Sequence, residues 1–259
     1  MKIIKATTNE IPQLKQIWYN TFNNDKEFID SFFENRWEKN NCYIIKDKDK
    51  ILSVIHCLKF SFTREMKTTE VSYIVGATTL KDYRRQGYIS NLLNFAHQEE
   101  GKILTLNPGF NPFFENHGFY YSSKSIVHKI QGNPKINTQN EKADIASIYI
   151  NAMEKNGYLD RDKFSWYNLQ SNCKTIVASH KKERAYALII EDIAFETMCE
   201  GLDSASALKK KLESMNISQI WMPSNSPLTY LFNSNHTFIP LGMSNEKNIC
   251  ANIYIPQQF

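Results

Sequence analysis

The chain has 259 residues, of which 42% are hydrophobic and 13% aromatic, a composition typical of folded globular proteins and not of disordered chains. Its net charge of +4 is spread along the chain without a basic block, which does not favour nucleic-acid binding. No apolar stretch approaches the roughly 20 residues of a membrane span, and MKIIKATTNE lacks the apolar core of a signal peptide. Five cysteines without a CxxC pair favour free thiols, so we expect a cytoplasmic protein without disulfides or a zinc site.

The first half alternates predicted strands and helices. Alternating residues predict a strand at 1–7, and helical spacing predicts helices at 11–22, with Asn9 as cap, and from about residue 25. Two strands around the turn KDKDK predict a hairpin at 42–62. Further along, the pattern predicts a strand at 71–79, a helix at 87–98, a strand at 102–106, a short helix at 111–116 and a strand at 119–129.

The second half repeats this order after a polar stretch, Gln131–Lys142, that we interpret as a linker. Helices are predicted at 143–156 and 162–170, and strands at 175–179, 185–191 and 193–199. A helix at 204–215, a strand at 217–222, a turn-rich stretch and a strand at 248–255 follow. We therefore predict two α/β domains, residues 1–130 and 143–259.

The segment ATTLKDYRRQGYISNLL (residues 77–93) places a basic turn between a predicted strand and a predicted helix. The start of a helix carries unpaired backbone N–H groups and a partial positive charge, and it binds phosphate well. Gly87 allows close approach of an anion, and Arg84 and Arg85 add donors that suit diphosphate oxygens. Because the pattern is short, a basic surface turn with a glycine cap is the alternative interpretation.

This segment resembles motif A of the GNAT superfamily of acetyl-CoA-dependent N-acyltransferases. In that family the end of the fourth strand offers backbone groups to pantetheine, and the following turn binds the CoA diphosphate. The resemblance assigns the strand end to Ala77, Thr78 and Thr79, and the diphosphate loop to Arg84, Arg85, Gln86, Gly87, Tyr88 and Ile89. Ile89 departs from the family, which usually has Gly or Ala there, and narrows the expected approach of the diphosphate.

A second segment, LNPGFNPFFENHGFYY, resembles the fifth strand, short helix and F-Y-x-x-x-G-F signature of the same family. Gly118 and Phe119 match its last two positions, and the resemblance adds Asn111 and Phe114 to the cofactor contacts. The tyrosine that protonates the departing CoA thiolate in many members is replaced by Phe114, which has no proton to donate. Core packing is the interpretation that we favour for Phe114.

The upstream half is similar to a GNAT branch related to the enhanced-intracellular-survival (Eis-like) acetyltransferases. That resemblance implies α/β architecture with two tandem GNAT-like mixed-sheet domains, the second degenerate, and without the sterol-carrier-like domain of larger members. In the second half the equivalent stretch reads EGLDSASALKKKL, with acidic residues and no R/Q-x-x-G, so we expect no cofactor there.

The sequence leaves the catalytic base open. Acetyl transfer requires a neutral amine, so a base or a water chain has to accept its proton. Glu70 is a candidate, with a solvated strand end as the alternative; the family's usual base position falls near Ser72 or Tyr73, neither of which is a carboxylate. In larger relatives the terminal carboxylate enters the active site, which makes the carboxylate of Phe259 a further candidate.

Three other sets of side chains could have either a functional or a purely structural role. We predict that most aromatic residues of the first two helices form core, although the loop NNDKE, with Trp18 or Phe22 nearby, would suit a cation. Glu115 and His117, which flank the short helix, are predicted surface residues. The remaining histidines have no metal-ligand spacing, so we predict no metal: His56, His97, His128, His180 and His236.

The resemblance to the GNAT superfamily implies an N-acetyltransferase that moves acetyl from acetyl-CoA directly to a primary amine on a small molecule or peptide. Polyamines, aminoglycosides, amino acids and protein lysines all stay open as acceptors, and so does the oligomeric state, a homo-oligomer included. The rival prediction is a non-catalytic GNAT fold that binds CoA or a partner, because Phe114 replaces the acid tyrosine.

Overall fold

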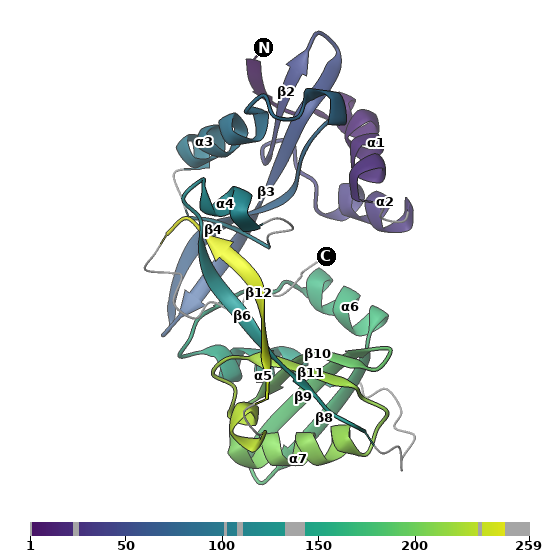
Figure 1. Ribbon diagram of the computed structural model, residues 1–259, viewed down its shortest axis with the longest axis vertical. Helices are drawn as coiled ribbons and strands as arrows, with labels where there is room; N and C mark the ends of the chain where they lie inside the picture. Colours follow the sequence, from purple (N-terminus) through teal and green to yellow (C-terminus); the bar gives the residue numbers. More distant parts are fainter. Residues whose placement is uncertain are drawn as a thin grey trace. The chain divides into compact units, whose positions relative to one another are not determined.

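The computed structural model describes residues 2–22, 26–100, 103–107, 111–132, 143–232 and 235–246 (Figure 1). The chain forms two compact units. The first consists of Met1–Ser61, Thr69–Tyr120 and Met243–Lys247, and the second of Phe62–Thr68, Tyr121–Gly242 and Asn248–Phe259. The predicted linker lies almost wholly outside the described residues, so the division into residues 1–130 and 143–259 stays a prediction.

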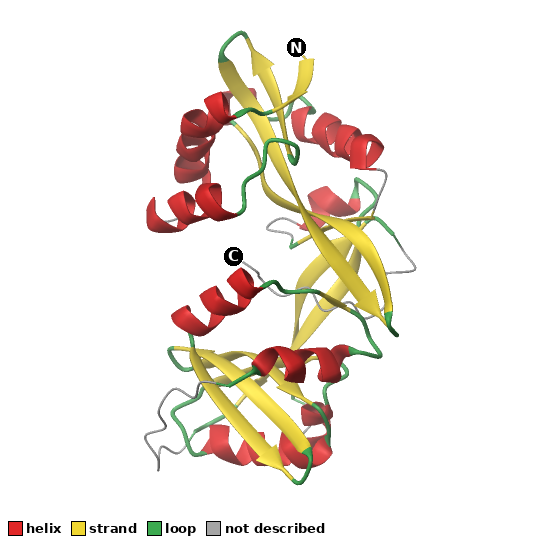
Figure 2. Ribbon diagram, turned by 180° about the vertical axis from the view of Figure 1, so that it is seen from behind, coloured by secondary structure: helices red, strands yellow, loops and turns green. Residues whose placement is uncertain are grey.

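The first unit is a mixed sheet with helices on both faces (Figures 1 and 2). Its elements are β1 (Lys2–Lys5), α1 (Ile11–Phe22), α2 (Lys26–Asn35), β2 (Cys42–Asp47), β3 (Lys50–Arg64), β4 (Lys67–Thr79), α3 (Tyr88–Glu100), β5 (Ile103–Leu106) and α4 (Asn111–Glu115). The 3-10 turns η1 (Thr8–Glu10) and η2 (Lys81–Tyr83) precede α1 and α3. The strand order is β1-β2-β3-β4-β5, antiparallel at β1–β2 and β2–β3 and parallel at β4–β5.

The second unit repeats this plan. Its elements are β6 (Tyr120–Lys129), α5 (Ile145–Met153), β7 (Tyr158–Leu159), α6 (Lys163–Asn172), β8 (Lys174–His180), β9 (Glu183–Ile190), β10 (Ile193–Cys199), α7 (Leu202–Glu213), β11 (Gln219–Pro223), η3 (Pro227–Leu231) and β12 (Thr237–Ser244). The strand order is β12-β6-β11-β10-β9-β8, with β10 and β11 parallel. Each half therefore has a parallel strand pair joined by one helix, α3 or α7, which confirms the predicted α/β fold of two tandem halves.

The last strand of each half pairs outside its own half of the sequence. β6 pairs with β11 over five residues, whereas Met243 and Ser244 of β12 pair with Leu106 and Thr105 of β5. β12 falls in the stretch interpreted as turn-rich, and that interpretation is wrong. Pro240 and Gly242 inside the strand gave the turn signal. The strand predicted at 248–255 lies outside the described residues.

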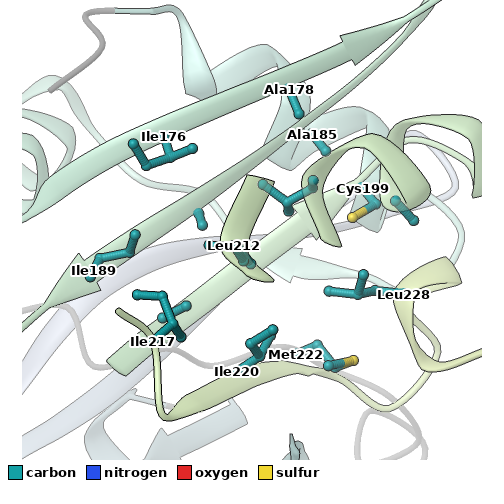
Figure 3. Packing of buried hydrophobic residues seen from close by; sticks show 14 of the residues in the cluster. Ile176, Ala178, Ala185, Ile189, Cys199, Leu212, Ile217, Ile220, Met222 and Leu228 are labelled. Atoms are coloured by element: carbon teal, nitrogen blue, oxygen red, sulfur yellow. The ribbon is translucent and has the colours of Figure 1, made fainter. Parts of the chain in front are cut away.

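Each sheet buries a different set of side chains on its two faces because successive strand residues point to opposite sides. In the first unit Ile55 packs with α3, and the next residue, His56, packs with Trp18 of α1. In the second unit Leu212 of α7 joins a cluster with Ile189 and Ile220, which Figure 3 shows between the helix and the strands. The opposite face packs on α5 and α6.

Several local expectations can be compared with the described residues. Thr7, and not Asn9, caps the 3-10 turn η1 that leads into α1, because Thr7 and Glu10 form a reciprocal capping box there. The cysteines within the described ranges are buried free thiols, as predicted: Cys42, Cys57, Cys173 and Cys199. No helix in the described part of the chain is both long and apolar enough to span a bilayer.

Candidate functional site

The end of β4 extends past its parallel partner β5. Pairing runs from Val71 with Ile103 to Ile74 with Leu106, where β5 ends, while β4 continues to Thr79. Among the described residues, β5 therefore offers no partner to the backbone of residues 75–79 on that side. Backbone N–H and C=O groups at such an edge can bind an extended amide chain. Ala77, Thr78 and Thr79 lie in this segment, and the last two side chains are buried.

Gly76 gives β4 its shape at the point where the pairing stops. Its φ of +60° is a conformation that side chains disfavour. A Cβ there would lie 2.5 Å from Cζ2 of Trp18, whose ring covers the strand. Trp18 and Gly76 therefore hold the free end of β4 in place.

The basic turn joins this strand end to α3. The Nε–H of Arg84 donates to the carbonyl of Thr79 at 3.1 Å, which folds the side chain back along the turn. Arg85 has φ +64° and Gly87 φ +77°, and a Cβ on Gly87 would find no atom within 4 Å. The first helical bond runs from the N–H of Asn91 to the carbonyl of Gly87 at 3.0 Å, so the N–H groups of the first turn have no acceptor within α3. The open turn has the chemistry of an anion site.

The side chains after Gly87 turn toward the core. Tyr88 and Ile89 both pack against the cluster that α3 forms with the sheet. The hydroxyl of Tyr88 donates to Oε1 of Gln86 at 2.8 Å. Ile89 therefore has a packing role, which accounts for a side chain larger than the family's Gly or Ala.

Phe114 lies in α4, which begins at Asn111. Its ring packs against the same core cluster and contacts Phe113 and Phe119 edge-on, with ring centroids 5.2 and 5.8 Å away. These contacts show that Phe114 packs against the core. Its side chain has no hydroxyl, so it cannot act as the acid.

His117 lies directly after α4 and is partly exposed, whereas Glu115 is exposed as expected. The ring is half-buried, with Nδ1 2.7 Å from the carbonyl oxygen of Phe113 and Nε2 2.6 Å from Oγ of Ser90 in α3. No sequence signal indicated this pair, because the two residues are 27 positions apart.

Of the three candidate bases, the structure describes two, Glu70 and Tyr73. Glu70 is exposed near the start of β4, ahead of the paired segment. Tyr73 is buried against Phe60, and burial raises the pKa of its hydroxyl, so it stays protonated near neutral pH. Phe259 lies outside the described residues.

A buried carboxylate that sequence reasoning missed lies beside Ser72. Oε2 of Glu100 accepts from the Ser72 hydroxyl at 2.8 Å, and Oε1 accepts from the Tyr43 hydroxyl at 2.6 Å. Lys59 forms an ion pair with the same carboxylate. With three donors the carboxylate is fully engaged, so we assign it to anchoring the end of α3 on β2, β3 and β4 and not to proton abstraction.

The aromatic residues of α1 and α2 are mostly core, as predicted. Trp18, Phe32 and Phe33 are buried and surround His56, with ring centroids 5.3–5.9 Å from the imidazole. Phe22 stays partly exposed. Residues 23–25 of the loop NNDKE lie outside the description.

The start of α7 differs from that of α3. The N–H of Ser204 donates to Oε2 of Glu183 at 3.0 Å, so a carboxylate of the chain itself occupies the first turn. Gly201 lies against that carboxylate, which a Cβ would overlap. No cluster of three or more His, Cys, Asp or Glu side chains suited to a metal occurs in the ranges that the structure describes.

A known family model matches the first half of the chain. Residues 2–119, just under half of the chain, match the family model "Acetyltransferase (GNAT) domain". No curated protein matches the chain by sequence.

Solved structures share the fold over most of the chain. A GCN5-related N-acetyltransferase from Anabaena variabilis has a TM-score of 0.72 at 14% identity, covering 94% of this chain and 72% of that one. Eis1 from Mycobacterium abscessus has a TM-score of 0.69 at 11% identity, covering 94% and 73%. A probable N-acyltransferase from Enterococcus faecalis has a TM-score of 0.68 at 14% identity, covering 94% and 72%. At sequence identities of 11–14%, these matches show that the chain shares the fold of these proteins.

Proposed function

We propose that the first half of the chain binds acetyl-CoA and transfers its acetyl group directly to a primary amine. The observation that carries the proposal is the combination of a β4 end that has no described partner on its β5 side with an open basic turn at the start of α3, in the part of the chain that matches the GNAT family model. The proposal also includes a cytoplasmic location for the protein and its membership of the Eis-like branch.

In the proposed reaction, N–H groups of the β4 end polarise the thioester carbonyl, as preorganised donors do in other acyl transfers. The amine nitrogen forms a bond to the carbonyl carbon and loses a proton to water, and the C–S bond breaks to release the CoA thiolate. The turn from Arg84 to Gly87 holds the diphosphate through backbone N–H groups and guanidinium donors. We assign no base, because the described carboxylates near β4 are exposed or fully engaged.

The second candidate is a CoA-binding module without catalysis. Phe114 favours it, since its ring packs against the core cluster and can supply no proton to the thiolate. A thiolate is nevertheless a tolerable leaving group near neutral pH, so loss of this acid does not rule out turnover.

The test is calorimetry with acetyl-CoA on the full chain and on the variant Arg84→Ala/Arg85→Ala. We expect micromolar-range binding, weakened by about 1.5–3 kcal/mol for each charged hydrogen-bond partner lost. Release of free thiol with spermidine, aminoglycosides, amino acids and lysine peptides then separates enzyme from module.

A matched control is Lys81→Ala, which removes a charge from the 3-10 turn just before the loop. Its affinity should stay near that of the natural protein. Equal affinities for all three proteins would remove the diphosphate assignment.

A further inference from the structure

His117 joins α4 to the first turn of α3 and has no part in the function proposed above. Its ring lies tilted by 32° against that of Phe113, with centroids 4.3 Å apart, and its nitrogens contact the Phe113 carbonyl and the Ser90 hydroxyl. Ser90 is the third residue of α3, so its backbone N–H belongs to the turn that would receive the diphosphate. The pair therefore lies directly behind the proposed anion site.

The hydrogen-bond inventory determines where the protons are. The Phe113 carbonyl can only accept, so Nδ1 of His117 carries a proton and donates it. In a neutral ring Nε2 can then only accept, so the single proton of the Ser90 hydroxyl has to point to the imidazole. In this state Oγ presents only lone pairs to its other neighbours, which repel an anion.

A second proton on the ring reverses this bond. Nε2–H then donates to Oγ of Ser90, and the hydroxyl proton is released to point at a phosphate oxygen. Helical side chains lean toward the N-terminus, which brings Oγ level with the first-turn N–H groups. The imidazolium also adds a positive charge one hydrogen bond behind the anion.

We propose that His117 is a positioning residue that acts through Ser90, and that binding of the CoA diphosphate is accompanied by uptake of a proton at His117. This inference rests on the proposed function. The charged residues on the adjoining turn and helix are Arg84, Arg85 and Glu115. His97, Glu99 and Glu100 lie further along α3, roughly 10 Å or more from Ser90. An arriving diphosphate supplies the negative charge that stabilises the protonated ring.

The test is calorimetry with acetyl-dephospho-CoA, which keeps the diphosphate but lacks the 3′-phosphate that titrates near neutrality. Binding is measured at one near-neutral pH in two buffers of different ionisation enthalpy, so that the enthalpy difference counts protons. We expect uptake of up to about one proton in the natural protein. Ser90→Ala and His117→Gln should abolish the uptake and weaken affinity about tenfold.

Two controls separate a positioning role from a structural one. Acetyl-pantetheine, which has no diphosphate, should bind the natural protein and both variants alike and without proton uptake. His97→Gln changes a histidine of the same helix that contacts Asn245, and should leave proton uptake unchanged.

Binding without proton uptake in the natural protein, or uptake that persists in His117→Gln, would overturn the inference and leave the proposed function intact. Failure of the natural protein to bind the ligand at all would overturn both. Thermal unfolding checks each variant, and if His117→Gln does not fold, Ser90→Ala decides.

Discussion

His56 is a buried titratable residue in the first unit that the proposed reaction does not use. Burial lowers the pKa of its imidazole to about 3. A backbone group of Val75 raises this pKa but has the smaller effect. The surrounding rings of Trp18, Phe32 and Phe33 bring no charge that could stabilise the protonated form. The folded protein therefore keeps this histidine neutral well below the pH at which the unfolded chain would protonate it.

This difference predicts how stability depends on pH. The unfolded chain binds a proton at His56 below about pH 6.5, whereas the folded chain does not until about pH 3, so stability falls as pH falls through this window. The expected slope from this site is about 1.4 kcal/mol per pH unit. Denaturant unfolding of the natural protein and of His56→Phe between about pH 6.5 and 5 measures it, and the variant should lose that slope.

Two other groups have to be separated from this effect. Burial also lowers the pKa of His128, so His128→Phe is measured alongside. Hydrogen bonds from Lys46 and Thr7 hold the pKa of Glu10 near 2, but that carboxyl affects stability only below its ordinary value of 4.5. His180→Gln, which removes an exposed imidazole, is the matched control for the loss of a histidine. An undiminished slope in His56→Phe would contradict the prediction.

At the scale of elements, α3 and α7 show what could be predicted from sequence. Both helices follow a strand and return to a parallel one, and local hydrophobic periodicity predicted both to within about two residues at each end. The contacts made by their first turns, in contrast, involve residues that are distant in the sequence. Neither Glu183 at α7 nor His117 at α3 could be predicted, because each comes from a different element brought near by folding.

The contrast between the two helix starts predicts one CoA per chain. At α3 a Cβ on Gly87 would meet nothing within 4 Å, whereas at α7 the Glu183 carboxylate already accepts from Ser204 and would repel a phosphate. Calorimetric titration with acetyl-CoA should therefore give a stoichiometry of about one. Glu183→Gln should keep it at one, because the α7 turn also lacks arginines. A stoichiometry of two for the natural protein would contradict the prediction.

At the scale of the whole molecule, the pairing of the last strands could not be predicted from sequence. Leu106 of β5 and Met243 of β12 are paired although 136 residues follow Leu106 before Met243, and periodicity carries no information about such partners. Met243 is also fully buried in the core cluster of α3, and Asn245 contacts His97 of that helix at 3.0 Å. The domain that carries the proposed acetyl-CoA site thus includes residues from the end of the described chain.

This connectivity predicts that the first half does not fold by itself. A fragment of residues 1–130 lacks Met243 and Ser244, which pair with β5, and lacks β11, which pairs with β6. It would leave two strand edges and part of the core cluster open, so we expect no cooperative unfolding transition and no binding of acetyl-CoA. The matched control is the full chain cut after folding at a protease site inserted within residues 133–142, which keeps every strand that the structure describes and should keep one transition and its affinity. If the fragment unfolds cooperatively and binds acetyl-CoA as tightly as the cut chain, the strands from the second half are not needed, and residues 1–130 are a complete domain.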